Sequence, residues 1–142
     1  IEFEQVKGRM LILFEQQRVW REVWMDGRAL PAKVDGPNLP DSRFYGYSVG
    51  RWEGDTLVVE SVGFRDDGWL DVYGSPLTDK GKLIERFRRP DYGHMEIDIT
   101  VDDPKAYTKP FTVRVSHQIM LDQELIEFIC NENEKSSQNY DK

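Results

Sequence analysis

Two ionisable side chains, Glu85 and His117, fall on the apolar faces of predicted β-strands. Apolar and polar residues alternate along 111–120 (FTVRVSHQIM), where His117 has the parity of the apolar set, and along 82–89 the more apolar face carries Glu85. A buried carboxyl group and an imidazole can move protons on a substrate that is held in an apolar pocket. The two residues therefore predict general acid–base chemistry, provided that both line one cavity.

A purely structural interpretation of these residues stays open. Burying an unpaired charge is costly, so each side chain needs a partner, such as a backbone carbonyl or a tyrosine for His117 and Arg21 for Glu85. In the catalytic interpretation, Arg21 or Tyr47 would instead stabilise negative charge on a substrate. Parity in the strand 18–25 allows Arg21 to point either into the core or away from it, with the tryptophans on the other face.

Aromatic residues are the candidates for the walls of a substrate pocket. Aromatic side chains with a few polar groups are typical of a site for a flat or apolar ligand, and they are equally typical of a filled core. The candidates for contact with the substrate are Trp20, Trp24, Tyr45, Trp69 and Tyr73.

The pattern of potential ligands predicts neither a metal nor a cofactor. The chain has one cysteine, Cys130, and two histidines, and parity places His94 on the solvent side of its strand, opposite to the apolar side that carries His117. The acidic stretch DDGWLD, at 66–71, does not have the spacing of a calcium-binding EF-hand loop and is more typical of turn and capping chemistry.

Composition bounds the class of protein. The chain has 142 residues, a formal net charge of -7 and a pI near 4.9, so its charge does not favour binding to nucleic acid. No apolar run is long enough to span a bilayer, and no membrane association is predicted. We expect one domain over 1–130 and a polar tail over 131–142, in a chain whose start at Ile1 suggests processing or trimming.

Period-two alternation predicts an all-β fold with about eight or nine strands. Turn signals lie at WEGDTL, at RPDYGH and at DDPKAYTKP, and one short helical turn is expected near 66–73. A meander of short strands favours an antiparallel barrel, closed like a lipocalin, because closure removes unpaired edges and leaves room for one small ligand. The expected strands are 1–6, 9–17, 18–25, 44–52, 56–64, 82–89, 94–102, 108–120 and 124–131.

Several motifs together resemble an uncharacterised bacterial family of exported, β-rich hypothetical proteins. They are GYSVGRWEGDTLVVESVGF, WLD, ERFRR, DDPKAYTKPFTV and LIEFICNENEK, which cover nearly the whole chain. The resemblance implies a periplasmic or secreted location and, because Asp71 matches the family pattern as Glu85 does, a catalytic role for Asp71. Where many members carry two histidines after WLD, this chain has Ser75 and Leu77.

We expect the barrel to bind a small, largely apolar or aromatic molecule. One alternative is a cofactor-independent isomerase, cyclase, lyase or hydrolase that uses Glu85 and His117, and another is a structural or partner-binding domain with a filled core. A homodimer is compatible with so small a barrel.

Overall fold

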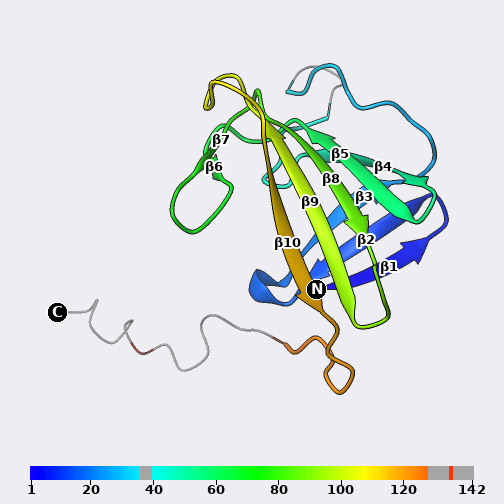
Figure 1. The fold of residues 1–142 in the computed structure, drawn as a ribbon. Helices are drawn as coiled ribbons and strands as arrows, with labels where there is room; N and C mark the ends of the chain where they lie inside the picture. Colours follow the sequence, from blue (N-terminus) through cyan, green and yellow to red (C-terminus); the bar gives the residue numbers. More distant parts are fainter. Residues whose placement is uncertain (36–39, 128–134, 136–142) are drawn as a thin grey trace.

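The fold is all-β and is built around one strongly curled sheet of eight strands (Figure 1). In this computed structural model the described residues are 1–35, 40–127 and 135. The strands of the large sheet are β1 (Glu2–Val6), β2 (Arg9–Phe14), β3 (Val19–Trp24), β4 (Tyr47–Glu53), β5 (Thr56–Val62), β8 (Lys82–Arg88), β9 (His94–Asp102) and β10 (Phe111–Gln118). A second, two-stranded sheet pairs β6 (Gly68–Trp69) with β7 (Pro76–Leu77).

The large sheet is a half-barrel and does not close, which corrects the prediction of a closed barrel. The strand order is β1-β2-β3-β4-β5-β8-β9-β10, so β1 and β10 are its two edges. The predicted strand 124–131 would have added pairing beyond β10, but 124–127 have no regular structure and 128–131 lie outside the described residues. With a first strand of only five residues and no ladder joining it to β10, the barrel stays open.

The chain is not a simple meander either. Residues 25–46 cross over between β3 and β4, which pair in parallel through only two residue pairs, Val23 with Ser48 and Trp24 with Val49. All the other neighbours in the large sheet pair antiparallel. The turn signals at 53–56, 89–94 and 102–110 predict this pairing for β4 with β5, β8 with β9 and β9 with β10. The three prolines of 28–43 lack a backbone N–H, which makes this segment a poor strand.

Residues 66–73 form no helical turn, contrary to the prediction. They lead into and form the first half of the β6–β7 hairpin. The one helical segment in the described chain is the short 3-10 helix η1 (Gln16–Arg18). The hairpin projects from the half-barrel (Figure 1). Its aromatic side chains, Trp69 and Tyr73, are exposed. None of the described helices is long and apolar enough to cross a membrane.

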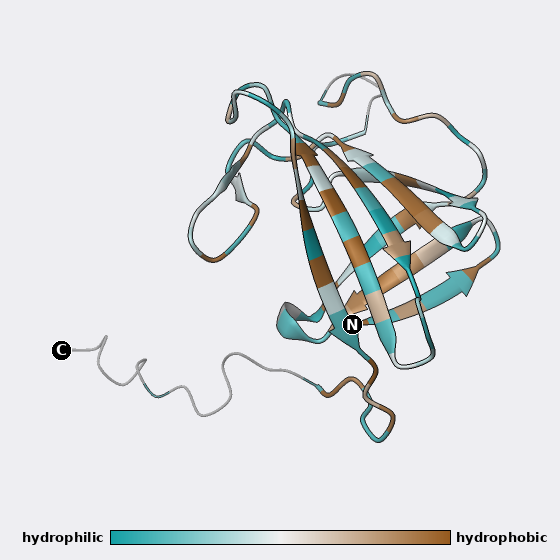
Figure 2. Cartoon of the chain, in the orientation of Figure 1, coloured by the Kyte–Doolittle hydropathy of each residue, from teal (hydrophilic) through white to brown (hydrophobic). Residues whose placement is uncertain are grey.

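The core fills the concave face of the sheet. Alternating bands of apolar and polar residues run along β8, β9 and β10 (Figure 2), as the period of two requires. The apolar residues on this face form one buried cluster, which consists of Met10, Ile12, Val23, Leu57, Val59, Phe87 and Ile97. Half-buried Phe3 and Met95 extend the cluster towards the gap between β1 and β10.

Gly46 stands at a point that only glycine fits, just before β4. Its φ is +64°, and a Cβ there would lie 2.7 Å from the carbonyl oxygen of Val62 and 2.9 Å from the ring of Phe64. We expect Gly46→Ala to lower the free energy of unfolding by about 2 to 4 kcal/mol in urea denaturation, because strain and overlap add. Gly54→Ala is the matched control, since Gly54 has φ +59° and no atom within 4 Å of its Cβ position. Equal losses in both variants would show that the contacts at Gly46 do not matter.

Candidate functional site

A buried polar network spans the concave face from β3 to β8. Arg21 Nη1 donates to Glu85 Oε1 at 2.9 Å, and Nη2 donates to Glu85 Oε2 in a fork that binds both carboxylate oxygens. The remaining donors reach two serines, with Nε 3.1 Å from Ser48 Oγ and Nη2 2.7 Å from Ser61 Oγ, and the two serine oxygens lie 2.8 Å apart. All four residues are buried.

Strand register explains how these four side chains meet. Ser48 pairs with Ser61 across β4 and β5, and Glu85 pairs with the neighbouring Val59 across β5 and β8. Arg21 therefore points into the core with Val23, and the polar atoms there are satisfied. The structural interpretation of Glu85, a pairing with Arg21, matches this geometry; both carboxylate oxygens of Glu85 already accept hydrogen bonds from the guanidinium.

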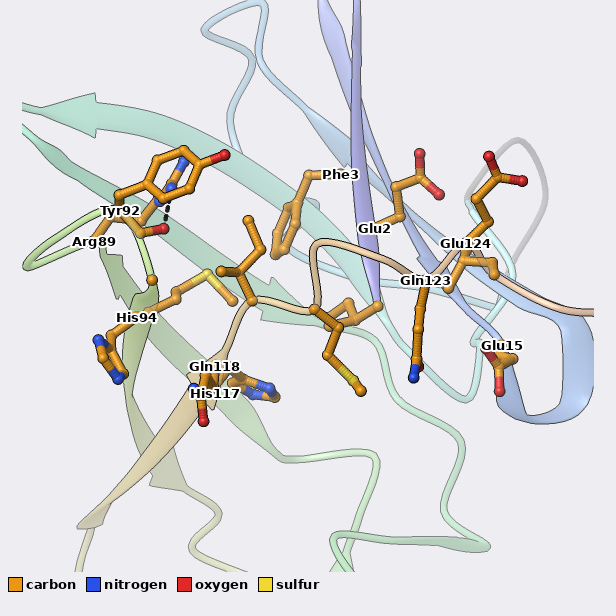
Figure 3. Close-up of a pocket in the computed structure, with 16 residues that line it drawn as sticks. Glu2, Phe3, Glu15, Arg89, Tyr92, His94, His117, Gln118, Gln123 and Glu124 are labelled. Atoms are coloured by element: carbon orange, nitrogen blue, oxygen red, sulfur yellow. Dashed lines mark hydrogen bonds between the residues drawn. The ribbon is translucent and has the colours of Figure 1, made fainter.

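A separate pocket of about 830 Å³ lies at one end of the gap between β1 and β10 (Figure 3). Its floor is the end of the apolar core at Phe3 and Met95, and His117 projects from β10 into its wall. Residues of the segment 119–125, which follows β10, form the outer side of the pocket. The lining residues are Ile1, Glu2, Phe3, Glu15, Arg89, Tyr92, Gly93, His94, Met95, His117, Gln118, Ile119, Met120, Gln123, Glu124 and Leu125.

Charged residues divide between the two sides of this pocket. Arg89 and His94 lie on one side, and the glutamates at positions 2, 15 and 124 lie on the other (Figure 3). Arg89 Nη2 donates to the carbonyl oxygen of Tyr92 at 2.7 Å, which leaves most of its donors for other acceptors. His94 Nδ1 lies 2.8 Å from a carboxylate oxygen of Asp91 and holds the pKa of that carboxyl below its usual range.

The structure does not bring Glu85 and His117 together. His117 pairs with Met95 and Glu85 pairs with Ile99, so their partners on β9 lie four residues apart, a distance of about 13 Å along the strand. His117 lines the pocket and Glu85 does not. The two residues therefore do not share this pocket, and Glu85 lies in the middle of β8, where it is bonded to Arg21.

Other predicted site residues lie away from the pocket. Because the Arg21 side chain points into the core, Trp20 and Trp24 lie on the convex face. There the Arg28 guanidinium stacks on Trp24, 3.6 Å from the ring centroid. Arg28 Nη1 also donates to Tyr47 Oη at 3.0 Å. Tyr45 stacks on the ring of Phe14, the last residue of β2, with centroids 5.4 Å apart. None of the residues predicted to contact the substrate lines the pocket.

The predicted residues of the β6–β7 hairpin serve the turn. Asp71 Oδ1 accepts from the backbone N–H of Tyr73 at 2.8 Å, and Ser75 Oγ donates to Asp71 Oδ2 at 2.7 Å. The bond from Ser75 holds the pKa of Asp71 below its usual range. Trp69 and Tyr73 are exposed on the same hairpin. Asp71 thus has the turn and capping role that the DDGWLD composition indicates.

Sequence reasoning missed most of the pocket. His117, Met95 and Ile119 carried a signal through their inward parity. The wall combines segments near residues 1–3, 89–95 and 117–125, whose proximity depends on where the sheet opens. No group of His, Cys, Asp and Glu in the described chain is arranged to hold a metal ion. Comparison of the chain with models of protein families, with curated proteins and with solved structures finds no match.

Proposed function

We propose that the protein binds a small, largely apolar or aromatic molecule in the pocket between β1 and β10. The observation that carries this proposal is a cavity of about 830 Å³ whose floor is continuous with the hydrophobic core. Pockets for small ligands commonly enclose about 300–1,000 Å³ and combine apolar walls with a few polar groups. Phe3, Met95 and Ile119 are the apolar surface that a ligand would cover.

The polar residues support a ligand with an apolar body and polar ends. Arg89 can donate to an acceptor on one side, and His117 can donate or accept at the wall. Binding is proposed ahead of acid–base catalysis because Glu85 is bonded to Arg21 and lies outside this pocket. His117 lines the pocket without Glu85, so the predicted pair of proton-transfer groups is not assembled there.

Titration with the neutral apolar dye Nile red tests the proposal. We expect an increase in fluorescence on binding, and a loss of affinity of about tenfold or more in Ile119→Asp, which places a charge on the apolar wall. Val113→Asp is the matched control, since Val113 is 45% exposed and Ile119 43% exposed, and Val113 does not line the pocket. Native mass spectrometry of the purified protein reveals a natural ligand directly as added mass.

Two results would contradict this function. One is dye binding that Ile119→Asp leaves unchanged, and the other is an equal loss in Ile119→Asp and Val113→Asp. Either would place the bound dye elsewhere than in the pocket between β1 and β10.

A further inference from the structure

The last strand of the half-barrel has a free edge that lacks the usual protection against pairing. Edge strands are commonly protected by lysine, by proline or by bulges. The strand β10 (Phe111–Gln118) contains neither lysine nor proline. Its one charged side chain, Arg114, lies on the convex face. On the concave face Val113 and Val115 remain 45% and 38% exposed. By contrast, the other edge, β1, presents Glu2 and Glu4 to solvent.

The direction of the backbone shows which groups this edge offers. Ile119 N donates to the carbonyl oxygen of Gly93, on the β9 side, and N–H and C=O groups alternate in direction along an antiparallel strand. The odd-numbered residues of β10 therefore face β9, and Thr112, Arg114, Ser116 and Gln118 direct their backbone groups to the free edge. A further strand would form hydrogen-bonded pairs at these four positions.

Charges on the convex face alternate in sign towards the same edge. Arg86 on β8 pairs in register with Asp98 on β9, and Asp98 pairs with Arg114 on β10, whose Nε donates to Asp98 Oδ1 at 2.6 Å. A strand added beyond Arg114 would continue this ladder with an acidic residue at the opposing position. Cross-strand pairs of opposite charge stabilise a sheet, whereas like charges destabilise it.

The chain supplies such a strand immediately after β10. A turn already forms at Leu121–Asp122, and four-residue loops commonly join antiparallel strands. We propose that residues 123–127 dock on the free edge of β10 as an antiparallel strand, with a loop over 119–122. In this register Ile126 lies opposite Val115 on the concave face, and Glu127 lies opposite Arg114 on the convex face.

The position of Ile126 and the charge of Glu127 favour this register over its neighbour. A shift by one residue would place Glu127 opposite Val115, on the apolar face, and would bring Ile126 to the convex face. In the proposed register the exposed valine surface is covered by Ile126, which is 65% exposed in the structure. The same register places Glu124 opposite His117 and Leu125 on the convex face, so Ile126 and Glu127 are the residues that favour this alignment.

The contacts that hold these residues in the structure are weak enough to exchange. Ile126 N donates to Glu15 Oε2 at 3.3 Å, and Arg18 forms an ion pair with Glu127 in which both side chains are exposed. Exposed ion pairs contribute little to stability because water and salt screen them. Docking on β10 would replace these contacts with backbone hydrogen bonds and a covered apolar face.

The exchange would also act on the pocket, and this consequence rests on the proposed function. Gln123, Glu124 and Leu125 line the outer side of the pocket in the structure. Docking would move Gln123 and Glu124 to positions opposite Gln118 and His117, which line the β10 wall of the pocket. The segment would then be a strap with two positions, one over the pocket and one on the sheet.

Disulfide trapping in the full-length chain tests the docking, with Cys130→Ser removing the native thiol. Val115→Cys/Ile126→Cys reports the proposed pairing, because directly opposed residues of a non-hydrogen-bonded pair have Cα atoms about 4.5 Å apart, within disulfide range. Glu15→Cys/Ile126→Cys reports the position over the pocket. In a glutathione buffer we expect the first pair to show an effective concentration about tenfold higher than the second. Adding Glu127→Lys is expected to reduce the first disulfide severalfold, and the control Gln123→Lys to leave it unchanged.

Each other outcome overturns the proposal. Disulfide-linked dimers of the Val115→Cys/Ile126→Cys variant would show that the edge pairs with a second copy. Preferential oxidation of the Glu15→Cys/Ile126→Cys pair, or no disulfide in either variant, would show that the segment does not reach β10. Because no dye or ligand enters this experiment, its failure is distinguishable from a failure of the proposed binding function.

Discussion

Removing either partner of the buried ion pair, by Glu85→Ala or Arg21→Ala, is expected to lower the free energy of unfolding by about 3 to 5 kcal/mol. Each single variant leaves a charge in the core without its partner, next to serines that cannot neutralise it. Equilibrium denaturation in urea, followed by tryptophan fluorescence, measures the loss. This is the largest effect that we expect from any single substitution, although neither residue lines the pocket.

The double variant Arg21→Met/Glu85→Leu distinguishes the pairing from other roles of the two residues. Replacing a buried pair by apolar residues of similar volume is often neutral, and Ser48 and Ser61 remain hydrogen-bonded to each other at 2.8 Å. We therefore expect the double variant to recover most of the stability that either alanine variant loses. A loss below about 1 kcal/mol in the single variants would show that the pair is hydrated like a surface ion pair.

Asp103→Ala is expected to cost about 2 to 4 kcal/mol of stability, because one buried carboxylate organises the turn after β9. Asp103 Oδ2 accepts from the backbone N–H of Thr78 at 2.7 Å, and Oδ1 accepts from the Thr78 hydroxyl at 2.9 Å and from the N–H of Lys105 at 3.1 Å. The carboxylate thereby joins the β7–β8 connection to the β9–β10 turn. Thermal and urea denaturation of the variant measure the cost.

The neighbouring residue provides the matched control. Asp102 has the same side chain and is exposed, so Asp102→Ala is expected to change stability by no more than about 0.5 kcal/mol. Asp103→Asn, which keeps one acceptor oxygen, should fall between the two. Similar stabilities for Asp102→Ala and Asp103→Ala would contradict the proposed role of the Asp103 carboxylate.

The sequence could predict the strands and most of the faces that they bury. Alternation in 94–102 and 111–120 placed His94 outward and His117 on the apolar side; in the structure His94 is exposed and both histidines line the pocket. These strands have one apolar and one polar face, so the period of two is unambiguous. In the strand 18–25 both faces contain large side chains, and only Glu85, Ser48 and Ser61, which are distant in sequence, settle the direction of Arg21.

The opening of the sheet could not be predicted in the same way. Alternation reports which residues share a face, and it does not report which strands are neighbours or whether the two edges meet. The parallel contact of β3 with β4 depends on the path of 25–46, and the pocket depends on the gap between β1 and β10. For this reason Phe3 and Arg89 gave no local signal. The acid–base activity and the exported location stay predictions.

The most direct test of the central claim, ligand binding at the gap between β1 and β10, is an NMR titration of the ¹⁵N-labelled protein with 2-naphthol. We expect saturable shifts of the amide signals of Phe3, Met95, His117 and Ile119, with the signals of the buried network around Arg21 unchanged. Shifts confined to the exposed hairpin at Trp69 and Tyr73, or no saturable shift at these four amides, would contradict it.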